Sequence, residues 1–396
     1  MSMTLALVTT ARSDYSTMYP VMRAAIDDSD INAKVFCGGM HLLSEFGSTY
    51  QQLLEDDIEI SEKIDFFILD QGRESLAKSL SIGVDKFSQA IVKHNIDMIL
   101  VSGDRIENLA LYCAATCLRI PICHLCGGDI TEGAFDNQVR HTMTKLSHLH
   151  MVSMREHYDR VIQMGEEPWR VTITGDAALD TVNNIQLLTR EQLFECEGIP
   201  KDNDLLLCTF HPLTIGSENF RLQFDNLLYF LSQQPEIPII TYPNIDPGFE
   251  ELVSKLHIFS NERPDLIIKK SFTRQGYYSM MHHAKYMIGN SSSGIWEAPS
   301  FHLPCINIGG RQSGRKRSCN VVDISGNSIN EFRSALEKIY GSSFQKNLKN
   351  CHNPYGEGRA SDKIIDVIKN TQINDKLLIK KFFQIENPIE HGVVYG

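Results

Sequence analysis

The stretch DMILVSGDRIENLALYCAATCLRIPICHLCGGD, from Asp97 to Asp129, decides how the first half of the chain folds. It contains an apolar run that ends at Gly103-Asp104, a segment with helical spacing, and a second apolar run that ends in two glycines before Asp129. Such a strand–helix–strand unit predicts two parallel strands and a helix that covers one face of their sheet. In parallel sheets of this kind the ligand binds at the carboxyl ends of the strands. The polar residues at these ends are therefore the first candidates for a site.

The same alternation continues on both sides of this unit. Upstream, the apolar runs 4–10 and 32–39 flank a segment with helical spacing, and residues 75–95 form a long amphipathic pattern. A second series of apolar runs and helical segments follows residues 166–180 and extends beyond residue 320. The sequence therefore predicts an α/β protein with two Rossmann-like domains, each built on a parallel sheet.

The change between the two series sets the expected domain boundaries. We place the hinge between about Gly175 and Leu205. The sequence then predicts an N-terminal domain at 1–180 and a second domain at 181–375. We expect the tail, 376–396, to pack back on the first domain.

Composition limits the classes of function. The 396 residues carry 49 acidic and 38 basic side chains, a formal net charge of -11, which argues against nucleic acid as a partner. No apolar run is long enough for a membrane span, and no basic residue precedes the first apolar run as in a secretory signal. Ten cysteines that form no regular disulfide framework predict reduced thiols, a cytoplasmic protein and no metal site.

The stretch IGNSSSGIWEAPS, from Ile288 to Ser300, places three serines between a Gly-Asn turn and a helical segment. Backbone N–H groups and hydroxyls at such a turn can bind a phosphate. We assign Ser291 and Ser292 to this role, and Glu297 to the hydroxyls of a ribose or to a capping box. Two alternatives stay open: one serine only caps the helix, and Arg311 and Arg315 belong to a solvated loop and not to the phosphate site.

Three carboxylates follow strands of the first domain and are candidates for proton transfer. Asp104 ends the strand SGD beside Arg105, and Asp129 and Asp136 flank a loop that begins with two glycines. Glycine lets the backbone approach a sugar closely, and acids that share a pocket can divide acid and base work between them. The alternatives are an Asp–Arg surface pair for Asp104 and a helix cap for Asp136.

These stretches resemble the UDP-N-acetylglucosamine 2-epimerases, most closely the hydrolysing branch that serves sialic-acid and legionaminic-acid pathways. Besides 289–315, the matching blocks are TTARSDYSTMYPVM (9–22), GGMHLLSEFGSTYQ (38–51), residues 103–150 and FHPLT (210–214), in the same order and over nearly the whole chain. The resemblance implies the two-domain glycosyltransferase-B type of fold, with the active site in the interdomain cleft. It places the sugar and the catalytic residues on domain 1–180 and the nucleotide on domain 181–375. It also implies a nucleotide-sugar substrate, no cofactor, and a homodimer or homotetramer.

The resemblance implies a two-step reaction. A base removes the C2 proton while the nucleoside diphosphate leaves C1, and water then adds to the resulting 2-acetamidoglucal to release the free 2-epimer. Asp104, Asp129, Asp136 and His211 become the expected catalytic residues, whereas Arg12 is assigned to the phosphates and His41 to the sugar. A surface position for Arg12, a core position for His211 and a plain loop position for His41 are the respective alternatives.

The chain departs from the family pattern at one place. Where relatives carry HxHGGE or HxEGGE, this chain has HLCGGD, with Cys126 in place of Glu or His and Asp129 in place of Glu. A thiol is a poor substitute for a carboxylate unless it is activated. The substrate also stays open between UDP-N-acetylglucosamine and a UDP- or GDP-linked N,N'-diacetylbacillosamine. A glycosyltransferase on the same fold and an inactive nucleotide-sugar sensor are the alternative functions.

Overall fold

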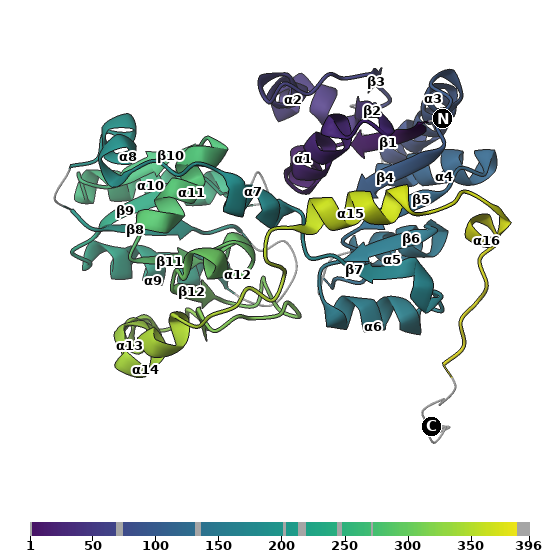
Figure 1. The fold of residues 1–396 in the computed structure, drawn as a ribbon. Helices are drawn as coiled ribbons and strands as arrows, with labels where there is room; N and C mark the ends of the chain where they lie inside the picture. The colour runs from purple at the N-terminus through teal and green to yellow at the C-terminus, as the bar shows by residue number, and fades with distance from the viewer. Residues whose placement is uncertain are drawn as a thin grey trace, which may run out of the picture. The chain divides into compact units, whose positions relative to one another are not determined.

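Two separate parallel sheets organise the protein in the computed structural model, which describes residues 2–68, 74–130, 136–200, 203–212, 219–243, 248–270 and 272–385. The chain divides into two compact units. The first holds the described residues up to Asp129, those from 136 to Asp180, and those from Gly358 onward, and the second holds those from Thr181 to Glu357. Each unit is described by itself (Figure 1).

The first unit is built on a seven-stranded parallel sheet with the order β3-β2-β1-β4-β5-β6-β7. Its strands are β1 Met3–Thr9, β2 Ile31–Gly38, β3 Glu62–Ile64, β4 Met98–Ser102, β5 Ile122–Leu125, β6 Leu149–Val152 and β7 Val171–Ile173. Its helices are α1 Arg12–Asp27, α2 Tyr50–Glu55, α3 Ser75–Lys93, α4 Asn108–Leu118, α5 Asp136–Leu146, α6 Arg155–Gln163, α15 Ala360–Lys369 and α16 Asp375–Leu378, and α7 Ala178–Asn184 crosses the boundary between the units. Short 3-10 helices at Gly39–Leu42, Ser44–Phe46 and Pro168–Arg170 complete it.

The second unit has a six-stranded sheet with the order β10-β9-β8-β11-β12-β13, and all of its pairings are parallel. Its strands are β8 Leu205–Thr209, β9 Ile237–Thr241, β10 Ile267–Lys269, β11 Tyr286–Gly289, β12 Cys305–Ile308 and β13 Val321–Ile324. Its helices are α8 Arg190–Glu197, α9 Phe220–Ser232, α10 Phe249–Glu262, α11 Arg274–His283, α12 Ser293–Trp296, α13 Ile329–Tyr340 and α14 Ser342–Leu348, with a 3-10 helix at Ala298–Phe301.

Burial explains why the strand segments are apolar throughout and do not alternate. Along β1, Leu5 and Leu7 join one hydrophobic cluster, whereas Ala6 and Val8 join another. Both faces of the strand are therefore covered by helices, as Figure 1 shows for the sheet of the first unit. The predicted α/β class with two Rossmann-like sheets is confirmed.

Strand order locates the place where each sheet can bind a ligand. In the first sheet β1 lies between β2 and β4, so the chain leaves β1 and β4 in opposite directions along the sheet. In the second sheet β8 has the same position between β9 and β11. The carboxyl ends at these switch points are the usual binding crevices of open α/β sheets.

The C-terminal boundary differs from the sequence prediction of 181–375 for the second domain. Helix α15 packs against α1, as Figure 1 also shows, and Ile364 and Ile368 join the core of the first unit. The Asp180 carboxylate accepts hydrogen bonds from the backbone N–H groups of Ala360 at 2.8 Å and Ser361 at 2.6 Å. The second unit therefore ends at Glu357, because the apolar face of α15 is buried in the first unit.

The described part of the tail lies on the first unit. Arg170 is almost fully buried, and its guanidinium donates to the carbonyl oxygens of Lys376 and Leu377, each at 2.8 Å. Lys380 Nζ lies 2.8 Å from a carboxylate oxygen of Glu166. A buried guanidinium is stable only when its donors are satisfied, and here the tail's carbonyl groups satisfy them.

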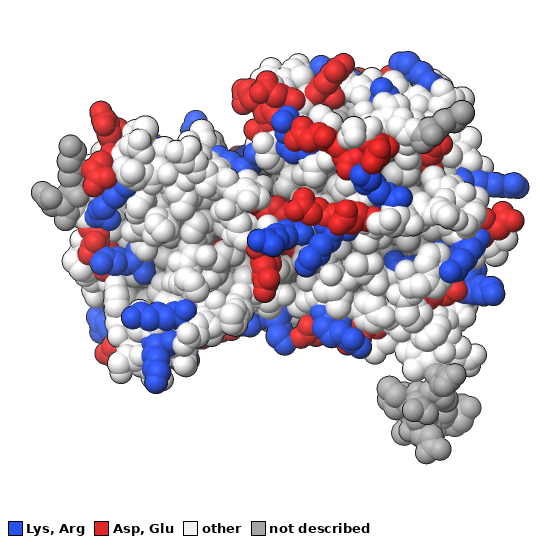
Figure 2. Space-filling model, in the orientation of Figure 1, with Lys and Arg blue, Asp and Glu red and all other residues white. Residues whose placement is uncertain are grey.

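Three further expectations concern cysteines, membranes and charge. Cys319 and Cys351 are paired as a disulfide with Cα atoms 5.8 Å apart, so the prediction of ten reduced thiols is wrong for this pair. Tertiary folding alone brings the two cysteines together, since they are 32 residues apart in the sequence. Within the described ranges, the structure contains no helix that is long and apolar enough for a membrane span. Figure 2 shows acidic and basic side chains interspersed on the drawn face.

Candidate active site

The first group of candidate residues lies at the switch point of the first sheet. Asp104 and Arg105 follow the carboxyl end of β4, beside the carboxyl end of β1. Gly103 N–H donates to the Leu125 carbonyl oxygen at 3.3 Å, which continues the pairing of β4 with β5 by one residue. The strand ends therefore bring the loop that carries Asp104 next to the turn that begins at Cys126.

A buried arginine joins three of the predicted residues. The Arg140 guanidinium on α5 forms an ion pair with the Asp104 carboxylate and also donates to the Asp129 carbonyl oxygen at 2.9 Å. Arg140 lies one helical turn after Asp136, so both side chains point to the same side of α5. We call Asp104, Asp129, Asp136 and Arg140 the carboxylate cluster. The sequence reasoning missed Arg140, although its spacing from Asp136 was a usable signal.

The carboxylates of this cluster have different surroundings. Burial and then the negative charge of Asp104 raise the pKa of Asp136, against the opposing effects of Arg105 and Arg140. Asp104, by contrast, is held in an ion pair by a guanidinium that is itself buried. Like charges that share a site favour one proton between them. The geometry therefore places an Asp104 that is ion-paired with Arg140 beside an Asp136 whose pKa is raised.

The turn after β5 contributes a thiol and a carboxylate. Cys126 has a φ of 63°, which is unusual for a residue other than glycine, and its thiol accepts from Ser102 Oγ at 3.9 Å. Burial and then the negative charge of Asp176 raise the pKa of this thiol, so it stays protonated at neutral pH. Asp129 is buried, and its Oδ1 lies 3.4 Å from His157 Nε2 on α6. The turn thus offers one carboxylate, and its thiol is not a thiolate nucleophile.

His41, the predicted sugar contact, lies in the 3-10 helix that follows β2. His41 is fully buried, and its Nε2 and Nδ1 lie 2.9 Å from Thr9 Oγ1 and 2.8 Å from Thr49 Oγ1. Burial lowers the pKa of His41 to about 4. These contacts make His41 a support for the loop after β1. Its predicted contact with a sugar stays a prediction.

Arg12 and Arg105 are the predicted cationic groups of this unit. Arg12 is exposed at the start of α1 and forms no ion pair within the described part of the chain. Arg105 Nη2 lies 2.8 Å from the carboxylate of Glu107, which is buried. Arg12 is therefore available to an anion, whereas Arg105 is already partly neutralised.

The second group of candidate residues lies at the switch point of the second sheet. The Asn290 side chain accepts from the His211 N–H at 2.7 Å and donates to the His211 carbonyl oxygen at 2.9 Å. Gly289 has a φ of 138°, and a Cβ atom there would collide with the Thr209 carbonyl oxygen. The end of β11 therefore packs directly against the end of β8, and Asn290 fixes the backbone of His211.

The serines of the Gly289–Ser293 segment, here called the serine turn, make one long capping contact, in which Ser291 Oγ accepts from the Ser293 N–H at 3.4 Å. Helix α12 comprises only four residues, and Ser292 at its N-cap makes no capping hydrogen bond with its side chain. Ser293 interacts with the buried phenol of Tyr277, and burial raises the pKa of Tyr277. A single helical turn contributes little dipole. The predicted phosphate site would therefore use the hydroxyls and N–H groups of the turn and nearby cations, and it stays a prediction.

Those cations belong to the loop after β12. Arg311 Nη1 donates to the Asn290 carbonyl oxygen at 3.2 Å, and Gln312 Nε2 donates to the same oxygen at 2.9 Å. Burial and the positive charge of Arg311 lower the pKa of His211 to about 3, so the imidazole is neutral at pH 7. The alternative of a solvated basic loop does not describe Arg311, because it contacts the serine turn directly.

An aromatic stack extends this side of the second unit. The rings of Trp296 and Tyr355 stack with centroids 4.0 Å apart, and the Arg315 guanidinium lies 4.7 Å from the centre of the Trp296 ring. The Tyr355 hydroxyl donates to the Lys316 carbonyl oxygen at 3.2 Å. Glu297 follows Trp296, so the stack fixes the segment that carries the predicted ribose ligand.

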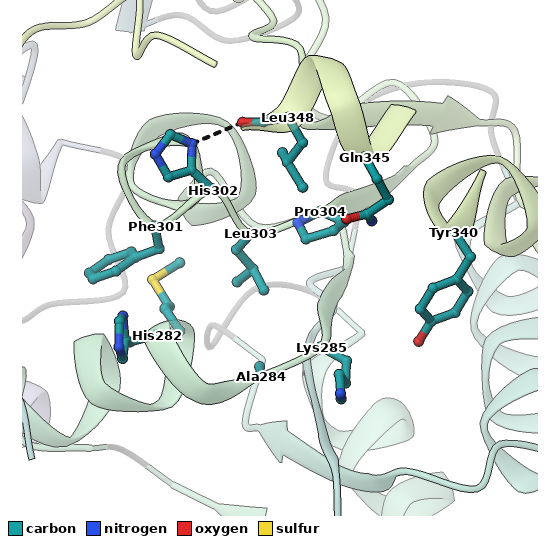
Figure 3. Close-up of a pocket in the computed structure, with 11 residues that line it drawn as sticks. His282, Ala284, Lys285, Phe301, His302, Leu303, Pro304, Tyr340, Gln345 and Leu348 are labelled. Atoms are coloured by element: carbon teal, nitrogen blue, oxygen red, sulfur yellow. Dashed lines mark hydrogen bonds between the residues drawn. The ribbon is translucent and has the colours of Figure 1, made fainter. Parts of the chain in front are cut away.

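A separate cavity lies at the opposite edge of the second sheet. It measures about 350 Å³, and its lining includes Lys285 and Pro304, which directly precede β11 and β12 (Figure 3). In the same lining His302 Nδ1 is hydrogen bonded to the Leu348 carbonyl oxygen at 2.9 Å. The cavity is therefore at the amino ends of the strands, away from the serine turn. Within the described ranges, no cluster of three or more His, Cys, Asp or Glu residues could hold a metal ion.

Two sheets of Rossmann strand order, each with polar residues at its switch point, define the two-domain glycosyltransferase-B type of fold. Solved structures agree: a Neisseria meningitidis UDP-GlcNAc 2-epimerase bound to UDP-GlcNAc matches with a TM-score of 0.73 and 19% identity, over 93% of this chain and 100% of that one. A putative UDP-N-acetylglucosamine 2-epimerase from Listeria monocytogenes matches with a TM-score of 0.75 and 18% identity, over 93% and 96%.

Sequence comparison identifies the family. The family model described as UDP-N-acetylglucosamine 2-epimerase matches residues 23–369. The GDP/UDP-N,N'-diacetylbacillosamine 2-epimerase (hydrolyzing) of Campylobacter jejuni is 35% identical over 386 residues, 96% of this chain and 99% of that protein. The UDP-N,N'-diacetylbacillosamine 2-epimerase (hydrolyzing) of Legionella pneumophila is 30% identical over 376 residues, 94% and 97%. The chain belongs to the UDP-N-acetylglucosamine 2-epimerase family and is a nucleotide-sugar 2-epimerase, as the resemblance predicted.

Proposed function

We propose that this protein is a hydrolysing 2-epimerase, which releases a free 2-epimer sugar and a nucleoside diphosphate. The observation that carries the proposal is the pairing of Asp104 and Asp136 in different electrostatic surroundings. Elimination followed by hydration needs one ionised and one protonated group, because a proton leaves C2 from one face and returns on the other. One carboxylate held by Arg140 and a second with a raised pKa meet this need.

The steps follow from these roles. Asp104 removes the C2 proton while the C1–O bond to the diphosphate breaks, which leaves a 2-acetamidoglucal. Asp136 then protonates C2 from the other face, and water adds its hydroxyl group at C1 and gives its proton to the Asp136 carboxylate. Asp104 releases to solvent the proton that it took from C2. The free sugar leaves with inverted C2.

The leaving diphosphate needs positive charge and hydrogen-bond donors. Ser291, Ser292, Arg311 and the fixed backbone at His211 supply them in the second unit, and exposed Arg12 supplies a guanidinium in the first. Glu297 is assigned to the ribose hydroxyls. That one ligand contacts both groups of residues stays a prediction, as does a homodimer or homotetramer.

We infer that the sugar is an N,N'-diacetylbacillosamine type, because the Campylobacter jejuni and Legionella pneumophila relatives, 35% and 30% identical, are named for that substrate. N-acetylglucosamine is the second candidate, supported by a Neisseria meningitidis UDP-N-acetylglucosamine 2-epimerase that is 26% identical over 381 residues. The two sugars differ at C4, where one carries an acetamido group and the other a hydroxyl.

The test uses both UDP-sugars and the GDP analogue in D2O without any acceptor, followed by NMR. We expect free sugar with inverted C2, deuterium at C2, and an equal amount of nucleoside diphosphate. A product that keeps its nucleotide would refute hydrolysis and indicate a non-hydrolysing epimerase. Substrate that stays unchanged without acceptor would instead support the transferase or the sensor.

A further inference from the structure

Helix α6 lies directly against the double-glycine turn that carries Asp129. A Cβ atom on Gly128 would collide with the backbone carbonyl oxygen of His157 and would lie 3.0 Å from Val161 Cγ2. The Arg160 guanidinium donates to the Gly128 carbonyl oxygen. Gly128 therefore lets the turn pack on α6, which is a different reason from the close approach of a sugar expected from the sequence.

The same helix supplies the partner of the Asp129 carboxylate. His157 Nε2 lies 3.4 Å from Asp129 Oδ1, and the two side chains are only 6% and 10% exposed. On the other side of the turn, Arg140 donates to the Asp129 carbonyl oxygen and pairs with Asp104. Asp129 is therefore held by α6 through its side chain and by α5 through its backbone.

The charged groups around Asp129 show why its contact with His157 matters for the orientation of the carboxylate. Asp176 acts on the neighbouring thiol of Cys126 as a negative charge, and Arg160 and Arg140 are the cations that face the turn. The Cys126 thiol stays protonated and carries no charge. Asp129 has the only carboxylate of the turn Cys126–Asp129. A buried carboxylate needs a donor that fixes its direction.

We propose that His157 is a positioning residue that holds the Asp129 carboxylate of the carboxylate cluster in one orientation. The inference rests on the proposed function and extends it to a residue on α6 that does not contact the reacting atoms. With His157 in place, Asp129 keeps one rotamer, and the backbone contact with Arg140 keeps its distance to Asp104.

Two substitutions test this role. His157→Leu removes the donor, whereas His157→Gln keeps an N–H group at a similar reach. We expect His157→Leu to lower kcat by about tenfold or more with little change in KM, because misplacement of a group by about 1 Å can cost up to a hundredfold. His157→Gln should recover a substantial part of the rate. Asp159→Asn, a change on the exposed face of the same helix, is the control and should leave the rate unchanged.

A double-mutant cycle separates orientation from general damage. In an Asp129→Asn background, His157→Leu should cause little further loss, since no carboxylate remains to be oriented. Equal losses in both backgrounds, or a His157→Leu enzyme with kcat within twofold of wild type, would overturn the proposal.

Two readouts keep this test apart from the test of hydrolysis. Deuterium exchange at C2 in D2O reports proton transfer whether or not the nucleotide is released. The crystal structure of the His157→Leu protein with UDP reports the Asp129 rotamer independently of turnover. We expect the carboxylate to turn away from its wild-type direction, and an unchanged rotamer would refute the role of His157 even if the enzyme proved to be non-hydrolysing.

Discussion

The Asp136→Asn substitution separates the chemistry of this residue from its contribution to folding. Asn has nearly the same shape as Asp but neither accepts nor delivers a proton at neutral pH. If Asp136 protonates C2, turnover should fall by at least about a hundredfold, which corresponds to about 2.7 kcal/mol of activation free energy. UDP affinity should stay near the wild-type value, because the serine turn and Arg311 provide the contacts assigned to the diphosphate.

The raised pKa of Asp136 sets the sign of the effect on stability. Burial and the charge of Asp104 favour its protonated form in the folded state. Such a group stabilises the fold below its unfolded pKa of about 4, and this contribution is lost as the pH rises through the higher folded pKa. Asn carries no charge at any pH. The variant should therefore match or slightly exceed the wild type in stability at pH 7 and lose that advantage at acidic pH.

Asp104→Asn is the matched comparison. It removes the partner of the buried Arg140 guanidinium, which keeps its bond to the Asp129 carbonyl oxygen. We expect it to lose turnover and also about 1.5–3 kcal/mol of unfolding free energy, the scale of a hydrogen bond to a charged group. NMR of product formation and urea unfolding measure the two effects. An Asp136→Asn enzyme that keeps more than about a tenth of the wild-type rate would remove Asp136 from the mechanism.

Three further outcomes follow from single features. Ser292→Ala should weaken UDP binding by about 1–2 kcal/mol, the scale of a hydrogen bond to a charged group, and unchanged affinity by calorimetry would show that the hydroxyl does not bind phosphate. Gly289→Ala should destabilise the second unit, because its Cβ atom collides with the Thr209 carbonyl oxygen; thermal unfolding at the wild-type temperature would contradict this. Burial lowers the pKa of His41 to about 4 and of His124 to about 3. Their neutral forms stabilise the fold above the unfolded histidine pKa of about 6.5, and this stabilisation is lost as the pH falls through the lower folded pKa values. Urea unfolding at pH 5 should therefore give a lower free energy of unfolding than at pH 7. Equal values at the two pH values would refute the prediction.

The sequence by itself determined the class of fold and the edges at which the site residues lie. Apolar runs such as β4 and β5 separated by amphipathic helices specify parallel strands covered on both faces, and this pattern is local enough to be recognised without coordinates. Asp104, Asp129 and the serine turn each follow such a run directly. Their placement at carboxyl ends therefore follows from the same pattern.

Only the tertiary structure decided which side chains meet at those ends. Arg140 and His157 come from helices that follow the strand-end acids, and nothing in the local pattern shows that both reach Asp129. Helix α15 is a second example. Its apolar face could pack on either unit as far as its own sequence shows, and only its contact with α1 assigns it to the first unit. Local periodicity specifies which face of an element is buried. The partner of a buried charge, however, comes from a segment that is distant in sequence. The contacts that hold the carboxylates and shift their pKa values therefore appear only in the folded chain.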